Sequence, residues 1–394
     1  MKTAHYDIIL TGGGCAAYSF LNELIASRQL PRFKVLVLEA EATFAMNKTW
    51  CFWSKERSPL VSHQWQHMSF CSPKRQSSRS IAPYYYHMVS SEYFFRYSYQ
   101  KAKAFPSNIF FLQDKVVDIH RTVDGVSVTT SNHHFTASWV LNSIPTMIDS
   151  SQYRYWLWQH FRGWVIETKQ ECFSPEAFTM MDFRTPQQKG VEFFYVLPFS
   201  RHKALVEFTG FSPHTFEEDY YTQRLKQYIK NTLGVEHYKI TYSEGGKIPM
   251  TDYCFPRSTQ EHIIHTGVAG GLAKASTGYA FANIQQDVRQ LVNSLVQTGQ
   301  LTPHTASRQR FQFYDLLLLH IIQHKPEKVA SIMDCLFARN HYPSILKFLE
   351  EETSLIEDLR LLGSLPWAPF LQALKEISIQ EIYEKQRNMV NSRP

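Results

Sequence analysis

A glycine turn near the start of the chain holds the first residues with chemical potential. It reads Gly12-Gly13-Gly14-Cys15-Ala16-Ala17, between an apolar run, Ile8–Leu10, and a helical pattern, Ala16–Ile25. In the spacing Gly12-x-Gly14-x-x-Ala17, Gly12 permits a tight bend and Gly14 lets the backbone approach a pyrophosphate. The small side chain of Ala17 lets the helix pack closely on the strand. The free N–H groups at the helix start would hold the phosphates, so the turn predicts a bound dinucleotide.

An acidic residue in the right place supports this prediction. Phe33–Leu38 reads as a second buried strand and is followed by Glu39. A carboxylate there would accept hydrogen bonds from the ribose hydroxyls of the adenosine half. The alternative is a glycine-rich turn in a flavodoxin-like sheet without a nucleotide, but strand, turn, helix and acid in this order favour the dinucleotide.

A second glycine turn lies late in the chain. The strand-like run Ile263–Thr266 leads into Gly267-Val268-Ala269-Gly270-Gly271. Its N–H groups would lie near a flavin ring and ribityl chain, whereas an enzyme that binds only a nicotinamide needs no such turn. The two turns together therefore indicate a flavoprotein.

Composition limits the other possibilities. Of 394 residues, 44% are hydrophobic and 19% charged, as in an ordinary globular chain. The net charge, 41 − 35 = +6, is spread without a basic block, so no nucleic-acid partner is implied. The 6 cysteines form no C-x-x-C pair and the 17 histidines no ligand array, so we expect no metal and a reducing, cytoplasmic setting.

Membrane insertion is not expected. Asp7 interrupts the first apolar run, which argues against a signal peptide, and no stretch reaches the roughly 18 apolar residues of a membrane span. Two apolar segments, Phe311–Ile322 and Leu365–Phe370, are candidates for docking on a membrane surface, although helical core and a turn explain each of them as well.

The elements that position these turns follow a mixed pattern. We predict an α/β fold with a Rossmann-like FAD-binding domain of the two-dinucleotide-binding-domain flavoprotein type, an inserted β-rich substrate domain and a helical C-terminal part. Helical spacing covers Ser91–Phe105, Phe216–Leu233, Ile284–Leu295 and, near the end, Ile345–Leu362. The predicted regions are 1–150 and 256–300 for the two parts of the FAD domain, 151–255 for the substrate domain and 301–394 for the helices.

Four segments together resemble the bacterial lycopene β-cyclases. The first is the glycine turn with Glu39, and the second is Asn47-Lys48-Thr49-Trp50-Cys51-Phe52-Trp53, similar to that family's N-x-T-W-x-F element. The third combines Met181–Arg184 with the strands Phe194–Phe199 and Ala204–Thr209. The fourth is Gly270-Gly271 with Ser276-Thr277-Gly278-Tyr279. The resemblance extends over nearly the whole chain.

The chain departs from the family pattern at two places. An Asp-Gly-Arg-Gly-like element usually follows the strand that ends at Leu141, but this chain reads Asn142-Ser143-Ile144-Pro145, which puts flavin contacts there in doubt. The proline that often precedes the Ser/Thr-Thr-Gly-Tyr run is Ala275 here, a change that we expect to be tolerated.

The resemblance implies cyclisation of a linear carotenoid. Such enzymes protonate a terminal double bond of lycopene, close a ring and lose a proton, so that a β-ionone ring forms without net redox change. The implied cofactor is reduced FAD, with NAD(P)H as the reductant of the flavin. The implied partners are lycopene or a related acyclic carotenoid and, peripherally, the inner face of the membrane. The implied FAD contacts are Gly12, Gly13, Gly14, Cys15, Ala16, Ala17, Glu39, Lys48, Thr49, Trp50, Gly267, Gly270, Gly271, Thr277, Gly278 and Tyr279.

The chemistry needs a carboxylic acid that stays neutral, and Glu207 fits. Apolar residues flank it in Ala204–Phe208, and burial raises the pKa of a carboxyl. The alternative is a strand glutamate that faces solvent, but strand alternation places Leu205 on the same face. Asp182, Phe194 and Tyr195 are the predicted substrate-pocket residues; packing explains the aromatic residues equally well, and turn capping explains Asp182.

A second acidic segment looks similar to a motif of plant cyclases. Phe348-Leu349-Glu350-Glu351-Glu352-Thr353 resembles the sequence by which those enzymes present their acid. Because it falls in the helical pattern Ile345–Leu362, we interpret it as a solvated helix face, remote from the strand expected to face the flavin.

Two other functions remain open. A flavin-dependent monooxygenase, halogenase or isoprenoid reductase acting on a long apolar substrate would share the glycine turns but perform net redox chemistry. A non-catalytic flavin- or carotenoid-binding protein would not need Glu207.

Overall fold

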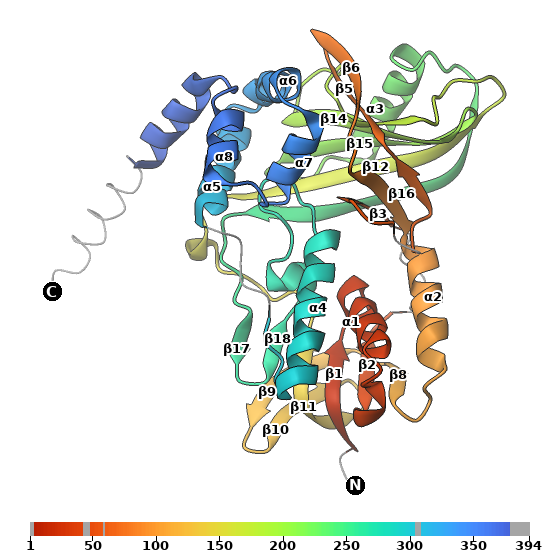
Figure 1. Ribbon diagram of the computed structural model, residues 1–394, viewed down its shortest axis with the longest axis vertical. Coiled ribbons are helices and arrows are strands. Elements are labelled where there is room, and N and C mark those ends of the chain that lie inside the picture. Colours follow the sequence, from red (N-terminus) through yellow and green to blue (C-terminus); the bar gives the residue numbers. More distant parts are fainter. Residues whose placement is uncertain (1–3, 42–47, 58–59, 304–308, 379–394) are drawn as a thin grey trace, which may run out of the picture.

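The computed structural model describes residues 4–41, 48–57, 60–303 and 309–378. Asn47 of the N-x-T-W-x-F-like element lies outside these residues. The chain forms two packed parts: one contains the first strands and helices, and the other contains a second sheet with the C-terminal helices beside it (Figure 1).

The first part is built on an eight-stranded sheet. Its main order is β17-β18-β11-β1-β2-β8, with the β9–β10 hairpin joined to β11, and β18, β11, β1, β2 and β8 run parallel. Parallel strands are buried on both faces, which explains the apolar run Ile8–Leu10. The strands are β1 Ala4–Thr11, β2 Val35–Glu39, β8 Ile109–Gln113, β9 Val116–Thr122, β10 Gly125–Thr130, β11 His134–Asn142, β17 Ser258–Gln260 and β18 Ile263–His265.

Three helices pack with this sheet. Helix α1 (Cys15–Ala26) contacts both α2 (Ser91–Lys103) and α4 (Phe281–Thr298). Apolar residues of α1 and α4 share one buried cluster with β1 and β2. Because α1 begins where β1 ends, its N-terminus lies at the carboxyl edge of the sheet, where α/β proteins bind ligands.

The second part is a seven-stranded sheet in the order β16-β12-β15-β14-β13-β5-β6. Helix α3 (Glu218–Asn231) packs on one face, because Val206 and Phe208 share an apolar cluster with its Leu225. The hairpin β5–β6 comes from early in the chain, inside the predicted first FAD segment. The strands are β5 His67–Ser72, β6 Arg75–Ser80, β12 Trp156–Thr168, β13 Ala177–Asp182, β14 Val191–Ser200, β15 Lys203–Ser212 and β16 Tyr238–Thr251.

A small sheet packs against the cores of both parts. It has the order β3-β7-β4, with β3 Thr49–Ser54, β4 His63–Trp65 and β7 Tyr85–Ser90. Side chains alternate along β3: Trp50 and Phe52 pack into the cluster of the first part, whereas Trp53 belongs to that of the second. Strand β3 therefore joins the two cores.

The C-terminal part is helical, as predicted, with one difference. The pattern over Ile345–Leu362 is two helices, because Glu351 adopts a left-handed φ of 62° and Ser354 caps a new helix through a capping box with Glu357. The helices are α5 Gln309–His324, α6 Val329–Arg339, α7 Tyr342–Leu349, α8 Leu355–Leu362 and a last one over residues 367–378. Among the described residues, no helix combines the length and apolarity that crossing a bilayer requires.

Candidate active site

The first glycine turn leaves room for a ligand at Gly14. A Cβ added there would meet no described atom within 4 Å, whereas at Gly12, with φ of 95°, it would collide with the Ser143 hydroxyl. Gly14 is also the N-cap of α1 and supplies no side-chain cap to the N–H groups that follow. The open space and the free donors fit a pyrophosphate.

Glu39 lies directly under this turn. Its Oε2 accepts a hydrogen bond from the Gly13 N–H at 2.6 Å, and its Oε1 accepts one from the Glu41 N–H at 3.1 Å. The structure thus brings Glu39 and the turn together, and the carboxylate holds the shape of the loop. Its contact with a ribose stays a prediction.

The second turn is a 3-10 helix, Gly267–Gly270, that ends on Gly271 with φ of 75°. A Cβ on Gly270 would strike the His265 carbonyl, and one on Gly278, with φ of 70°, would strike the Gln159 side chain. Two buried atoms here, Gln159 Oε1 and Thr277 Oγ1, have no hydrogen-bond partner among the described residues. Such orphaned polar atoms are uncommon in a folded interior and fit a polar cofactor that binds beside them.

The other predicted cofactor residues lie either at the start of α1 or near the start of β3. Ala16 and Ala17 are buried on α1, and Cys15 is partly buried beside them. The Lys48 N–H donates to the Ser91 hydroxyl at 2.7 Å, and the Trp50 ring stacks on Phe281, 5.6 Å between centroids. The structure therefore places Trp50 in the core, on the face of β3 away from Glu207.

Glu207 lies in the middle of β15, on the face away from α3. Its side chain is half-buried, yet burial is the main reason that its pKa rises to about 8; the negative charge of Glu244 adds to the shift, and the Thr209 hydroxyl opposes it. The Thr209 hydroxyl donates to Oε1 at 3.1 Å. The predicted neutral carboxyl therefore has the environment that such a group needs.

Four strands align Glu207 with three other residues. Strand pairing sets Tyr195 of β14 beside Glu207, Glu207 beside Gly163 of β12, and Gly163 beside Glu244 of β16. Residues paired across antiparallel strands share a face, so these four form one row, which we call the carboxyl row. Gly163 leaves the space between the two glutamates free of a side chain.

Sequence reasoning missed Glu244. It is 3% exposed, and its Oε2 accepts hydrogen bonds from Thr49 at 2.7 Å and Tyr242 at 3.4 Å. Burial raises its pKa to about 7, and these two donors oppose the shift. No motif marks this residue, because only strand register brings it opposite Glu207.

Aromatic side chains border the carboxyl row. The Tyr195 and Tyr279 hydroxyls lie 3.3 Å apart, and Trp53 meets the Tyr279 ring edge-on with 5.0 Å between centroids. Tyr195 and Tyr279, predicted for the substrate and the cofactor respectively, are thus brought together beside Glu207. Their ring faces offer cation–π stabilisation to a positive charge in this space.

Two predicted pocket residues lie elsewhere. Phe194 stacks on Tyr228 of α3, with 3.8 Å between centroids, and Asp182 accepts hydrogen bonds from Tyr228 and from Arg184. Both are therefore on the α3 face of the sheet, opposite the carboxyl row. The prediction that Phe194 and Asp182 share a pocket with Tyr195 was wrong, because neighbouring strand residues point to opposite faces.

The segment that resembles the plant motif is not a solvated helix face. Glu350 and Glu351 are half-buried in the turn between α7 and α8, and burial raises the pKa of Glu350 to about 8. Glu351 pairs with Lys274 at 2.7 Å, and Lys274 also pairs with Asp315 of α5 at 3.1 Å. The segment is thus anchored through Lys274 to the loop that follows the second glycine turn.

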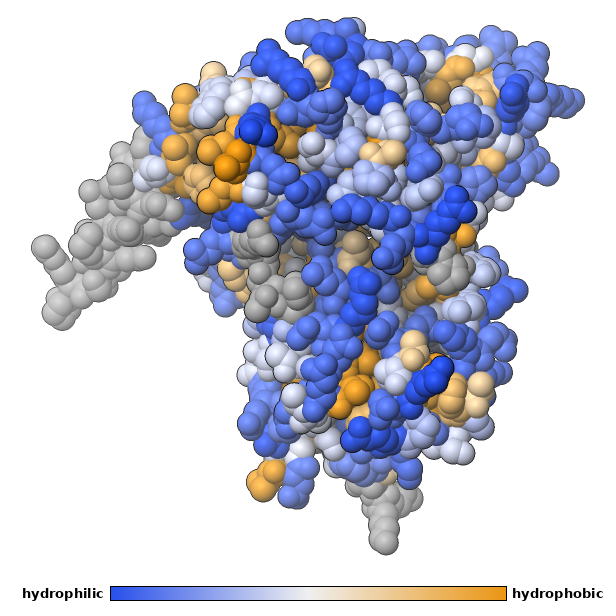
Figure 2. All heavy atoms as spheres, in the orientation of Figure 1, coloured by the Kyte–Doolittle hydropathy of each residue, from blue (hydrophilic) through white to orange (hydrophobic). Residues whose placement is uncertain are grey.

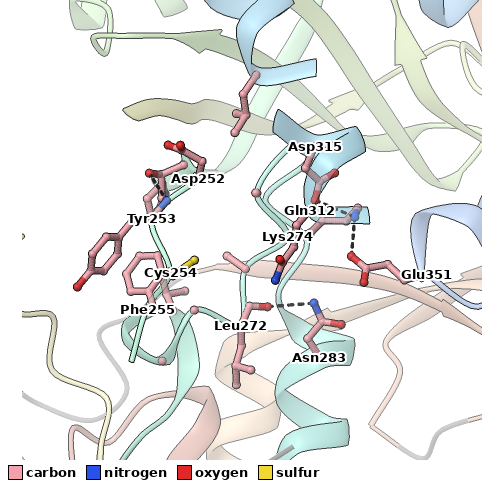
Figure 3. Close-up of a pocket in the computed structure, with 18 of the residues that line it drawn as sticks. Asp252, Tyr253, Cys254, Phe255, Leu272, Lys274, Asn283, Gln312, Asp315 and Glu351 are labelled. Atoms are coloured by element: carbon pink, nitrogen blue, oxygen red, sulfur yellow. Dashed lines mark hydrogen bonds and ion pairs between the residues drawn. The ribbon is translucent and has the colours of Figure 1, made fainter. Parts of the chain in front are cut away.

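A cavity of about 760 Å³ lies on this side of the second turn (Figure 3). Figure 3 shows Lys274 between Asp315 and Glu351, with Asn283 of α4 bonded to the Leu272 carbonyl at 3.1 Å. Its described lining includes neither Glu207 nor Tyr195 of the carboxyl row. Among the described residues no group of three or more potential ligands could hold a metal ion.

Solved structures with the same fold include flavoproteins. The chain matches a geranylgeranyl bacteriochlorophyll reductase-like protein from Thermoplasma acidophilum with a TM-score of 0.58 and 11% identity, covering 95% of this chain and 99% of that one. It matches p-nitrophenol 4-monooxygenase from Pseudomonas putida with a TM-score of 0.56 and 12% identity, covering 94% and 99%. A Klebsiella pneumoniae HpxO variant complexed with FAD matches with a TM-score of 0.56 and 13% identity, covering 92% and 100%. The predicted fold class is confirmed.

The sequence comparisons identify the family. Proteins named lycopene beta-cyclase, from Pseudescherichia vulneris and Pantoea ananas, are each 24% identical to this chain; the alignments cover 93% and 95% of it and 96% and 98% of those proteins. The family described as "Lycopene cyclase protein" matches residues 7–375. This chain belongs to the lycopene cyclase protein family.

Proposed function

We propose that the protein is a lycopene β-cyclase, an isomerase that converts the linear ends of lycopene into β-ionone rings. The observation that carries the proposal is Glu207, a carboxyl kept neutral by burial in a chain of this family. In its neutral form Glu207 can give a proton to the terminal double bond, and the neighbouring rings of Tyr195 and Tyr279 can stabilise the cation that follows.

FAD is the proposed cofactor, because the space at Gly14 and the orphaned atoms of Gln159 and Thr277 suit it. The α1 N-terminus would hold the pyrophosphate, and the second turn would hold the flavin end. NAD(P)H is the proposed reductant, and the bound, reduced flavin would supply negative charge close to the cation rather than net electrons.

Pigment chromatography after expression in lycopene-accumulating bacteria tests the function. Wild-type protein should produce ring-bearing carotenoids. Glu207→Gln should lower their formation by roughly 10²–10⁴-fold, the usual contribution of a general acid, while flavin absorbance is retained. Glu236→Gln, the same change at an exposed site before β16, is the matched control and should behave as wild type.

A flavin monooxygenase or isoprenoid reductase is the second candidate, since solved structures of this fold include a p-nitrophenol 4-monooxygenase and a geranylgeranyl bacteriochlorophyll reductase-like protein. The two candidates differ in electron balance. A cyclase uses NAD(P)H only to keep the flavin reduced, so many turnovers follow one reduction. Consumption of NAD(P)H in a fixed ratio to product would rule out the cyclase.

The proposed substrate dissolves in bilayers, so we propose peripheral association with the inner face of the membrane. Large apolar side chains are exposed on two neighbouring helices of the C-terminal part, at one end of the molecule (Figure 2). We call this set the apolar end; it comprises Leu355, Ile356 and Leu359 of α8 and Trp367, Leu371 and Leu374 of the last described helix.

A further inference from the structure

The two glutamates of the carboxyl row flank one glycine, Gly163 of the strand between them. A Cβ at residue 163 would lie 3.2 Å from Glu244 Cγ and 3.5 Å from Glu207 Cβ. Both side chains therefore come from strands on either side of β12 and border the position where Gly163 lacks a side chain. Two carboxyls in such a position resist ionising together, so one tends to hold a proton while the other is charged.

The surroundings differ in a way that assigns the proton. Glu244 accepts hydrogen bonds from the hydroxyls of Thr49 and Tyr242, and hydroxyl donors favour a carboxylate. Glu207 accepts one, from Thr209, at 3.1 Å. Glu244 is thus the better candidate for the charged form and Glu207 for the neutral acid, a division of roles found where two carboxyls share a site.

Glu244 also has an unused acceptor. Its Oε1 is buried and has no hydrogen-bond partner among the described residues. A buried charged oxygen without a hydrogen-bond partner lowers stability, unless a bound ligand or water supplies the missing hydrogen bond. Strand β3 lies over this side of the row, since Thr49 reaches Glu244 and Trp53 reaches Tyr279. The carboxyl row, with this unpartnered oxygen, therefore lies on the side of the sheet that β3 and its aromatic residue Trp53 cover.

We propose that Glu244 is the base of this site, the group that removes the proton released when the ring closes. The proposal rests on the proposed function. It divides the acid and base roles between two side chains and makes Gly163 the residue that allows them to exchange a proton.

The steps balance. Glu207 gives its proton to the less substituted carbon of the terminal double bond, whose π electrons form the new C–H bond and leave a tertiary cation on the dimethyl carbon. The electron pair of the next double bond attacks this cation and forms the ring carbon–carbon bond, so that the positive charge moves to a carbon of the new ring. Glu244 then takes a proton from the ring carbon beside the cation, and the electrons of that C–H bond form the ring double bond. Glu207 is left ionised and Glu244 protonated. Transfer of the proton across the Gly163 gap restores the pair, and no electrons leave the substrate.

The experiment uses the full-length protein loaded with reduced FAD and lycopene in liposomes prepared in D₂O. Wild type, Glu244→Gln, Glu207→Gln and the exposed control Glu236→Gln are compared for rate, for the position of the ring double bond and for deuterium content. In Glu244→Gln the acid remains, so deuterium should still enter the substrate. With no base in place, kcat should fall roughly 10²-fold or more with KM little changed, and misplaced ring double bonds or water-trapped alcohols should appear.

Each outcome decides the proposal. Wild-type rate and a single wild-type product in Glu244→Gln would overturn it, as would loss of deuterium uptake equal to that in Glu207→Gln. If Glu244→Gln fails to hold flavin, Glu244→Asp carries the test, because it keeps the charge but withdraws it by one methylene. It should give the normal ring isomer slowly, and an unchanged rate would contradict the proposal. Failure of wild type to cyclise lycopene would instead refute the proposed function itself.

Discussion

At the scale of single residues, Glu207 illustrates a conflict between function and stability. Its carboxyl has a pKa of about 8 in the folded protein, against the ordinary 4.5, so the folded state binds more protons than the unfolded state between these values. Stability contributed by this group is therefore complete below about pH 4.5 and declines as pH rises toward 8.

Glu207→Gln should consequently stabilise the protein more at pH 8 than at pH 5. Glutamine stays neutral and can still accept the Thr209 hydrogen bond. The difference in unfolding free energy between the two pH values should be about 1–4 kcal/mol, since each pKa unit corresponds to about 1.36 kcal/mol. Urea unfolding of wild type and variant at both pH values measures it. An equal effect at pH 5 and pH 8 would show that the carboxyl is ionised throughout.

Two glycines of the first turn should respond differently to the same substitution. Gly14 has ordinary extended backbone angles and open space, so Gly14→Val should fold normally but lose FAD, because the side chain would occupy the pyrophosphate position. Gly12 has a φ of 95°, and the Ser143 hydroxyl occupies the position that a side chain would take. Gly12→Val should therefore lower the free energy of unfolding by about 1–3 kcal/mol. Flavin absorbance and thermal unfolding of the apo-proteins separate the two effects. Retention of flavin by Gly14→Val would refute the assignment of the turn.

The sequence identifies some of these residues and cannot identify others. Glu207 is recognisable because apolar residues flank it within one strand. Glu244 is not, because its role depends on the register of β16 against β12, and register is set by contacts between distant segments. Phe194 was misplaced for a simpler reason, since its alternation with Tyr195 sends it to the other face.

At the scale of elements, Lys274 joins the second glycine turn to α5 and to the turn between α7 and α8. Its ammonium is buried, which disfavours the charge, but Asp315 and Glu351 hold its pKa above the ordinary value. Burial raises the pKa of Asp315 even though Lys274 opposes the shift, so that carboxylate depends on its partner.

Lys274→Met should therefore destabilise the protein by about 3–5 kcal/mol, the usual cost of leaving one member of a buried ion pair alone. Lys347→Met is the control, because Lys347 pairs with Glu357 on the surface, 35% and 41% exposed, and should cost no more than about 1 kcal/mol. Urea unfolding midpoints compare them. Equal effects would mean that Lys274 does not anchor the three elements.

Gly163 allows an element-level test of the carboxyl row. An alanine Cβ would lie 2.9 Å from Leu205 Cδ1 and 3.2 Å from Glu244 Cγ, both in flexible side chains, so the sheet should tolerate it while Glu244 moves. A displacement near 1 Å can lower a catalytic rate roughly 10²-fold, so Gly163→Ala should retain FAD and thermal stability but lose kcat. Steady-state kinetics with bound-flavin measurement test this, and an unchanged kcat would argue against exchange across the gap.

The apolar spacing of the sequence predicts where helices form better than it predicts where one helix ends and the next begins. Ser91–Phe105 corresponds to α2, whereas Ile345–Leu362 divides at Glu351 and Ser354. Apolar spacing continues through that break, because α7 and α8 both contribute to the same buried cluster. A turn held by tertiary contacts such as Lys274 with Glu351 leaves no periodic signal in the sequence.

At the scale of the whole molecule, the two-part architecture follows from strand patterns, but the exchange of segments between the parts does not. The hairpin β5–β6 leaves the first part and extends the second sheet through pairing of β5 with β13. Residues 67–80 and 177–182 are far apart in sequence. Because the entropy cost of closing a long loop changes little with its length, chain separation does not indicate which distant strands pair. This exchange, with β3 packing into both cores, couples the nucleotide turns to the carboxyl row.

The apolar end gives the last prediction, which concerns how the whole protein meets its substrate. Leu359 and Trp367 are 69% and 58% exposed, so replacing them removes little from the folded core. If this end enters the lipid interface, each large side chain contributes about 1.5–3 kcal/mol, and Leu359→Ser with Trp367→Ser should weaken liposome binding by roughly tenfold or more. Val123→Ser with Met147→Ser is the matched control, because these residues are 95% and 102% exposed away from the apolar end. Flotation with liposomes measures the binding of both. An equal loss in both double variants would show that the membrane contact lies elsewhere. A loss confined to the first would place the C-terminal helices against the bilayer, the source of the proposed carotenoid substrate.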